Sequence, residues 1–443
     1  MAMVVKNNLD ANSTLNKLNK NSSNLSKSLK KVSSGMKINS AADGASEYAI
    51  SERMRVRIRS LDQANQNTQN GNSMLKTAEG AVSSTVEILK TLKEKAINSA
   101  NDTNNAETDR QTIQKEIDQL VDQIDDNANV TYNGKYLIDG TKNSAGTATK
   151  STYINMSLAT DTTAATALTD LKDRAGHHLG IQESDRIETT FMTGDRCAIY
   201  IPTTVTVDNN VIDVLQADLA SSEALGYPLS DAPIVDSVVG TNHAGNDVTT
   251  PDGQNAVIIS SSNTGISKQI AGLSVRVIDS EGNIRKSATE ALNNFVEIIH
   301  PEDASEDNAI TFHTGEKANQ SIKVGFKDMR AKALGLKNDV TGNTVNVATV
   351  SRAEGAIAIL DTALSRALDM QTTLGAIQAR LDYTSSNLTV SSENTSASES
   401  TIRDADMAKE MTEYTKNNVL LQASQSMLAQ ANQNSSAVLS LLQ

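Results

Sequence analysis

Large aromatic side chains are scarce in this sequence. The 443 residues include no tryptophan, four phenylalanines and eight tyrosines, so aromatics make up 3% of the chain. A chain of this length has room for roughly two to four domains, but not for several aromatic-centred cores. The missing core volume has to come from Leu, Ile, Val, Ala and Met, which suits helices. The composition therefore disfavours an aromatic-centred globular enzyme.

Other features that mark common functional classes are also missing. The single cysteine excludes an internal disulfide framework and a zinc site built from cysteines. The net charge of −13 disfavours wholesale nucleic-acid binding. Because the sequence has no apolar run of about 18 residues, we expect no insertion into a membrane. Residues Met1–Asp10 lack the apolar stretch of a signal peptide, so we expect no cleavable one.

Proline is confined to the middle of the chain. All five prolines lie between Pro202 and Pro301. Proline lacks an N–H and clashes with the preceding helical turn, so helix interiors avoid it. Both flanks are therefore free to form long helices around a mixed, turn-rich middle.

The N-terminal flank has the spacing of three helices. Apolar residues at intervals of three and four from Ala11 to Met36 predict a narrow coiled-coil seam. The apolar members of this seam include Leu15, Leu18, Leu25, Leu29, Val32 and Met36. A stripe from Leu61 to Ala96 predicts a second helix, beginning near Ala45, and a third helix should end near Asn127. The segment Tyr132–Lys135 then indicates a turn around Asn-Gly.

The C-terminal flank repeats this spacing. Apolar residues from Val350 to Leu388 predict one long helix, which the serine-rich stretch 391–400 should weaken before another begins near Ile402. The last 27 residues contain no charged side chain but keep a stripe that includes Leu420, Met427, Val438 and Leu441. A solvated helix normally carries charges on its outer face. The tail is therefore either disordered or a helix enclosed by other chains.

The two terminal arms differ in charge. Residues 1–40 hold seven Lys and one Asp, and residues 404–443 hold two Lys and four acids, giving net charges of +6 and −2. Helices that leave at one end of the chain and return at the other would pair antiparallel. Neither arm has enough apolar surface to fold alone. We infer that the arms become ordered only on self-assembly.

The middle of the chain predicts an α+β domain, inserted at 142–308 between mainly α-helical flanks. The flanks should form long antiparallel coiled coils with a small β-hairpin region. Alternating apolar residues predict strands at 256–260, 273–279, 309–312 and 321–326, and helical spacing appears at 164–172, 211–219 and 288–299.

Reactive side chains do not form a recognisable catalytic or metal motif in the sequence. His177 and His178 are adjacent, without the spacing of a helical zinc protease. Cys197 begins a predicted strand and is better explained as a core thiol than as a nucleophile. Phosphate-binding loops and nucleophile elbows are absent from the sequence. We therefore expect no catalytic residue, metal or cofactor.

Four segments resemble the signatures of bacterial flagellins. They are Val32–Ala45 (VSSGMKINSAADGA), Gln69–Ala81 (QNGNSMLKTAEGA), Ile402–Met411 (IRDADMAKEM) and Gln422–Asn432 (QASQSMLAQAN). Their order and their presence at both ends make the resemblance specific. It covers 1–141 and 309–443, and the segment between them is where flagellins vary.

The resemblance implies a structural subunit and not an enzyme. Flagellins self-assemble into the filament of the bacterial flagellum for motility, after secretion through the flagellar type III export apparatus with an export chaperone. The implied partners are other copies of the chain, the export machinery, the filament cap and the hook-junction proteins. The implied location is extracellular, in the flagellum. The alternative is a hook–filament junction protein of the same family, for which poorer matches at Ala423–Asn432 would be expected.

The resemblance also implies a division of the chain. The parts are an inner-tube coiled-coil arm at 1–44, the two halves of a helical core domain at 45–141 and 309–402, a surface-exposed outer domain at 142–308, and an inner-tube helix at 403–443. The implied assembly interface comprises Leu15, Leu18, Leu25, Leu29, Val32, Met36, Leu420, Met427, Leu428, Val438 and Leu441.

One difference from the family concerns host recognition. In flagellins the helix corresponding to Ile88–Asn101 contacts the flagellin-sensing Toll-like receptor of animals. The family pattern has Arg where Thr91 stands and Leu where Lys95 stands, whereas Glu116 matches. Losing a planar donor and an apolar anchor removes two typical hot-spot side chains. We therefore expect weakened receptor activation.

Overall fold

The computed structural model describes residues 9–103, 107–162, 166–193, 196–204, 234–236, 256–261, 263–338 and 342–441. These residues fall into two compact units. The arm unit comprises 1–69, 313–320 and 383–443, and the core unit comprises 70–312 and 321–382.

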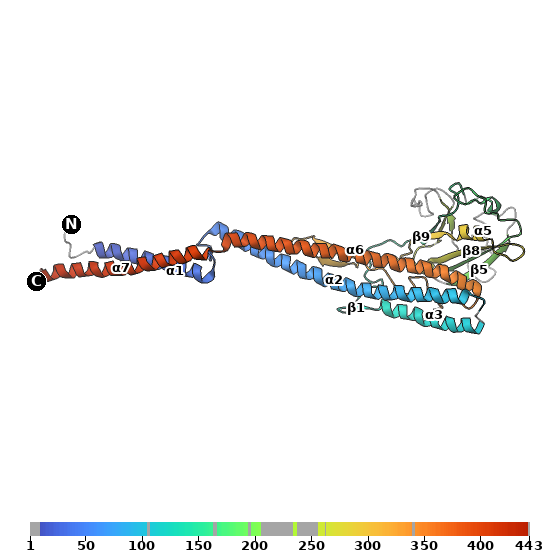
Figure 1. Cartoon of the computed structure of the whole chain (residues 1–443), viewed down its shortest axis with the longest axis horizontal. Coiled ribbons are helices and arrows are strands. Elements are labelled where there is room, and N and C mark those ends of the chain that lie inside the picture. The colour runs from blue at the N-terminus through green and yellow to red at the C-terminus, as the bar shows by residue number, and fades with distance from the viewer. Residues whose placement is uncertain are drawn as a thin grey trace. The chain divides into compact units, whose positions relative to one another are not determined.

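The arm unit is built on two pairs of helices. Helix α1 (Leu9–Ser34) lies beside α7 (Met407–Leu441), as Figure 1 shows. The start of α2 (Ala45–Ala100) packs against the end of α6 (Val350–Arg403), where Leu61 and Leu388 are buried together. Hydrogen bonds from Asn21 to Ser424 and from Asn417 to Ser28 fix the direction of the α1–α7 pair. The predicted antiparallel pairing is therefore confirmed, while supercoiling of the pair stays a prediction.

The serine-rich stretch does not interrupt α6, and the prediction of a break there is wrong. Helix α6 runs without interruption through residues 391–400 and ends at Arg403, so the next helix begins at Met407 and not near Ile402. Hydroxyl groups in the stretch donate to carbonyls four residues earlier, from Thr395 to Ser391 at 2.7 Å and from Ser398 to Asn394 at 2.8 Å. Their polar groups are satisfied inside the helix, so they do not compete with it.

Three helices enclose the aliphatic centre of the core unit. They are the remainder of α2, helix α3 (Glu107–Ala128) and the first part of α6. The predicted apolar stripe of α2 is buried, with Leu75, Leu89 and Leu92 fully enclosed. Ile117 and Ile124 of α3 complete the packing. Period-3.6 spacing therefore located this core from the sequence alone.

The predicted Asn-Gly turn joins a short hairpin. Strands β1 (Thr131–Tyr132) and β2 (Lys135–Tyr136) pair antiparallel across it. Asn133 and Gly134 both have positive φ, 50° and 75°, as a tight two-residue hairpin loop requires. Strands β10 (Ile310–His313) and β11 (Ser321–Val324) form a second two-stranded sheet.

The inserted region of the core unit holds two larger sheets. One has the order β6 (Ile234–Asp236), β7 (Ile258–Ser260), β3 (Thr152–Asn155) and β9 (Phe295–Ile299), and the other has β5 (Arg196–Thr204), β4 (Arg186–Thr193) and β8 (Ile270–Ile278). Helix α5 (Lys286–Asn293) packs beside them, and its buried Leu292 belongs to the same hydrophobic cluster as Val275 of β8. The α+β character expected of this region is confirmed.

Two helical predictions in the inserted region need correction. The pattern at 288–299 is part helix and part strand, because α5 ends at Asn293 and the β-branched residues after it pair with β3 as β9. In the pattern at 164–172, the described residues from 166 onward include a short 3₁₀ turn, η1 (Leu168–Asp170), and no longer helix, and a second such turn is η3 (Ile266–Lys268). The pattern at 211–219 lies outside the described residues.

Candidate functional site

The seam between α1 and α7 differs from the stripe that apolar spacing predicts. On α1, one series of half-buried or buried positions is Ala11, Thr14, Leu18, Asn21, Leu25, Ser28 and Val32, and Asn24 and Lys31 beside it are also half-buried. On α7, the corresponding series is Glu410, Tyr414, Asn417, Leu421, Ser424, Leu428 and Ala431, with Glu413 and Asn418 half-buried beside it. Both series alternate by three and four, so the seam keeps a heptad pattern but includes polar residues in place of several leucines.

Polar side chains hold this seam in one register. Asn417 Nδ2 donates to Ser28 Oγ at 2.9 Å, and both residues are buried. Asn21 Nδ2 donates to Ser424 Oγ at 2.7 Å. A buried polar pair has a large cost if it is separated, so pairing of this kind specifies register more than it adds stability. The predicted stripe of the C-terminal tail includes Ser424, but the apolar spacing of the sequence does not single out Asn21, Ser28 or Asn417, although each lies on a heptad position.

The apolar residues displaced from the seam face outward. Their exposed fractions are 43% for Leu15, 51% for Leu29, 42% for Leu420 and 62% for Met427. We call these four residues the outer stripe. Among the described residues of α1 and α7, the two that are buried are Ser28 and Asn417, both polar. The pair therefore leaves the four outer-stripe side chains available to something outside the chain.

Most of the predicted assembly residues divide into two groups, one in the seam and one in the outer stripe. Leu18, Leu25, Val32 and Leu428 lie in the seam within the chain, and Met36 lies half-buried just beyond α1. The outer stripe accounts for four others. Val438 and Leu441 belong to α7, but their side chains lie outside the described residues.

The predicted receptor residues lie on neighbouring helices of the core unit. Lys95 of α2 forms an ion pair with Glu116 of α3 at 2.6 Å. Thr91, one turn before Lys95, is exposed and donates its hydroxyl proton to the carbonyl of Glu87 at 3.0 Å. The structure therefore brings Lys95 and Glu116 together, with Thr91 on the adjoining turn.

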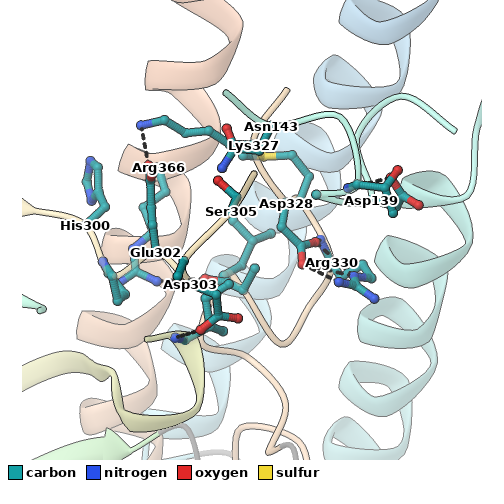
Figure 2. Close-up of a pocket in the computed structure, with 18 of the residues that line it drawn as sticks. Asp139, Asn143, His300, Glu302, Asp303, Ser305, Lys327, Asp328, Arg330 and Arg366 are labelled. Carbon is teal, nitrogen blue, oxygen red and sulfur yellow. Dashed lines mark hydrogen bonds and ion pairs between the residues drawn. The ribbon is translucent and has the colours of Figure 1, made fainter. Parts of the chain in front are cut away.

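A pocket in the core unit gathers charged side chains (Figure 2). Lys327 Nζ lies 3.3 Å from Glu302 and 3.6 Å from Asp369. Arg330 Nε donates to Asp328 at 2.9 Å, and Asp303 accepts the backbone N–H of Ile266 at 2.8 Å. These contacts engage the charges within the chain, so they explain the cluster as a structural joint. We assign no ligand to it.

A buried ion pair lies beside this pocket. Arg366 of α6 forms two hydrogen bonds with the carboxylate of Glu297 in β9, and it also donates to the carbonyl of Ala333 at 2.8 Å. His300 Nδ1 lies 2.9 Å from the same carboxylate. Burial raises the pKa of Glu297, but the Arg366 charge and the hydrogen bonds outweigh it, so the pKa lies below its usual value. The pair ties the inserted domain to the long helix.

Two other sequence candidates for chemistry are His177 and Cys197. His177 is exposed, and its Nδ1 lies 3.2 Å from Asp173. Cys197 belongs to β5 as expected, but its side chain lies outside the described residues. No group of three His, Cys, Asp or Glu suited to a metal ion occurs in the part of the chain that the structure describes. Within the same residues, no helix is long and apolar enough to span a bilayer.

Comparisons with known proteins agree with the signatures at the two ends. The family model for the bacterial flagellin N-terminal helical region matches residues 5–143, and the model for the C-terminal helical region matches 357–442. A flagellin of Clostridium tyrobutyricum is 34% identical over 433 residues, which are 97% of this chain and 99% of the relative. A flagellin of Bacillus subtilis is 30% identical over 458 aligned positions, covering 99% of this chain and all of the relative.

One solved structure has too little similarity to bear on function. It is hook-associated protein-3 of Legionella pneumophila, with 17% identity, a TM-score of 0.33, and coverage of 78% of this chain and 97% of that one.

Proposed function

The chain belongs to the bacterial flagellin family and is a structural subunit of the flagellar filament, and we propose that its α1–α7 pair is the surface through which copies polymerise. The family consists of structural proteins and not enzymes. The names of the curated relatives favour a filament subunit over the hook–filament junction protein.

One observation carries the proposal about the surface. The α1–α7 pair buries polar Ser28 and Asn417 within the chain while Leu29 and Met427 face outward. In addition, residues 417–443 have no charged side chain to keep an outer face solvated. Contacts with other copies would cover these apolar side chains. Contacts that repeat head to tail without closing give a helical polymer.

The two groups of assembly residues then have different roles. Leu18, Leu25, Val32 and Leu428 hold the pair together, and Met36 supports its base. The outer stripe, with Val438 and Leu441, contacts neighbouring copies. In this proposal residues 1–44 and 403–443 form the inner tubes, 45–141 and 309–402 form the helical core domain, and 142–308 project to the surface.

Substitution of two outer-stripe residues tests the proposal. We expect Leu420→Ser with Met427→Ser to abolish polymer formation, because each apolar side chain contributes about 1.5–3 kcal/mol when fully buried. The matched control is Gln422→Ser with Gln425→Ser, which changes two exposed polar residues of the same helix. Polymer is measured by sedimentation and negative-stain microscopy. Filaments formed by the first variant at the wild-type protein concentration would refute the assigned surface.

Membership of the flagellin family also supports proposals about how the chain is exported and where it functions. We infer that the chain passes through the flagellar type III apparatus with an export chaperone and functions outside the cell. The filament cap and the hook-junction proteins would contact it at the ends of the polymer.

The receptor face supports a proposal of weakened host recognition. The Lys95 ammonium is paired with Glu116, and the Thr91 hydroxyl is engaged by its own helix. Neither offers the planar guanidinium or the apolar side chain of the family pattern. Thr91→Arg with Lys95→Leu should raise activation in a receptor reporter assay at least about tenfold, the equivalent of ~1.4 kcal/mol. An unmodified chain that is already as potent as an ordinary stimulatory flagellin would contradict this.

A further inference from the structure

We propose that Arg403 positions the arm pair, so that its guanidinium fixes the direction in which α1 and α7 leave α2 and α6 and thereby sets the helical geometry of the polymer. The inference rests on the proposed role of the α1–α7 pair in assembly. Every contact used below lies within the arm unit.

Two chain connections run side by side at the base of the arm pair. One leads from α1 to α2 through residues 35–44, and the other leads from α6 to α7 through residues 404–406. The backbone N–H of Lys37 donates to the carbonyl of Arg403 at 2.8 Å, and that of Ala405 donates to Gly35 at 2.9 Å. Met36 and Asp404 form an antiparallel bridge between these two bonds. The two connections therefore cannot move independently.

The Arg403 side chain ties this ladder to α2. It is 6% exposed, and Nη1 donates to Glu52 Oε1 at 2.7 Å and to Ser51 Oγ at 3.4 Å. Nε donates to the sulfur of Met36 at 3.1 Å, and the guanidinium lies 5.7 Å from the centre of the Tyr48 ring. One planar group thus contacts the α1–α2 connection and the first two turns of α2.

The lowered pKa of Glu52 is consistent with a specific contact between Glu52 and Arg403. The hydrogen bond from Arg403 is the largest cause that lowers the pKa of Glu52, and the charge of Arg55 adds to it. Arg55 also pairs with Glu52, at 3.4 Å, but both residues lie on α2, so this pair cannot fix one helix relative to another. Arg403 and Arg55 therefore share one carboxylate and differ in what they join.

The remainder of the α1–α2 connection is shaped by its own contacts. Asp43 Oδ2 accepts the backbone N–H groups of Asn39 and Ser40, at 3.2 and 3.0 Å, and the Ser40 hydroxyl at 2.9 Å. Gly35 has φ 70°, a left-handed conformation that ends α1 without strain. The loop is thus preformed, and the tie to α6 comes from the ladder and Arg403.

A small change at this joint would be amplified along the arm. Helix α1 has 26 residues. Such a helix is roughly 40 Å long at ~1.5 Å per residue, so a tilt of about 5° at the base moves the far end by roughly 3 Å. A displacement of that size is enough to misplace side chains at a closely packed interface, and such interfaces respond by adopting a second packing. A change in the direction of the arm should therefore change the helical twist of the polymer.

The test compares filaments of the full chain carrying Arg403→Lys, Arg403→Ala or, as the matched control, Arg55→Ala. Lysine keeps the charge but cannot reach Met36, Ser51 and Glu52 as one planar fork. Helical twist and rise are measured by cryo-EM. We expect Arg403→Lys filaments to have a twist outside the spread of replicate wild-type maps, and Arg55→Ala filaments to match wild type. Wild-type twist and rise in Arg403→Lys would overturn the proposal, even if the yield of polymer falls.

Mixed filaments settle the case in which Arg403→Ala does not polymerise alone. The variant is copolymerised with wild-type chain at increasing fractions, with circular dichroism as the check on folding. We expect incorporation with a progressive shift in twist. An unshifted twist overturns the proposal, and so does exclusion of a folded variant, because Arg403 would then be required to form the arm pair and not to direct it. Failure of wild-type chain to polymerise would instead refute the proposed function.

Discussion

At the scale of single residues, the buried Arg366–Glu297 pair explains how an inserted domain is held on a helix. Both side chains are almost fully enclosed, and Gln269 and Ala333 accept two further guanidinium protons of Arg366. A buried charge is tolerated only when paired and hydrogen-bonded, so removing one partner costs more than the pair contributes. The pair acts as a fixed joint between β9 and α6.

Because of this pair, the free energy of unfolding should decrease as the pH is lowered. The pKa of Glu297 in the folded chain lies below its usual 4.5. The unfolded chain therefore binds more protons between the two pKa values, so the stabilisation is complete above about pH 4.5 and is lost as the pH falls through the folded pKa. Glu297→Gln should lower the free energy of unfolding at pH 7 by about 3–5 kcal/mol, because it leaves Arg366 buried without a counter-charge.

Denaturant unfolding from pH 7 down to pH 3 measures both effects. Glu306→Gln, which removes an exposed carboxylate of the same region, serves as the control and should behave like wild type. The variant Glu297→Gln should lose part of the pH dependence below about pH 4.5. Equal stability at pH 7 and an equal acid slope in all three proteins would show that the pair has no such role.

At the scale of elements, apolar spacing predicts where helices lie better than which way they face. Residues 11–36 fit two heptad series that share Ala11, Leu18, Leu25 and Val32. The sequence favours the series with Leu15 and Leu29 because it is more apolar, whereas the chain uses the one with Asn21 and Ser28. A single sequence cannot decide between them, because in the proposed polymer the leucines contact other copies of the chain, and the spacing within one chain does not represent those contacts.

Other parts of the fold cannot be predicted from the spacing because they depend on contacts between residues that are distant in sequence. Arg403 appears in a recognised segment, but its role depends on Glu52 and Met36, which are far away in sequence. The strand β9 is hidden within a helical pattern because its partner β3 lies about 140 positions earlier. By contrast, the stripe of α2 and the hairpin turn at Asn133–Gly134 are local, and both were predictable.

Helix α1 should be necessary for polymerisation as a continuous helix. Leu29→Pro removes a helical hydrogen bond and introduces a clash, at a cost of about 3 kcal/mol or more. We expect no polymer from this variant, while the loss of helicity by circular dichroism does not exceed the share of α1 and α7, because α2, α3 and α6 are untouched. The control Leu29→Met keeps the volume and should polymerise. Normal filaments from Leu29→Pro would contradict a continuous α1 in the assembled state.

At the scale of the whole molecule, the scarcity of aromatic residues reflects a division between two kinds of packing. The core unit completes its hydrophobic clusters within the chain, with Tyr153 and Phe326 among its largest buried side chains. The α1–α7 pair instead buries polar residues within the chain and presents leucine and methionine outward. If the proposed interface is correct, the packing of the subunit is completed only in the polymer, and this accounts for a long chain with few aromatics and no proline in its flanks.

A cryo-EM map of the polymer at side-chain resolution tests this account most directly. It should show Leu15, Leu29, Leu420 and Met427 buried against other copies of the chain, with the hydrogen bond between Asn417 and Ser28 kept within each subunit. A map in which the outer stripe faces water, or in which Asn417 pairs with a neighbouring copy, would contradict the account.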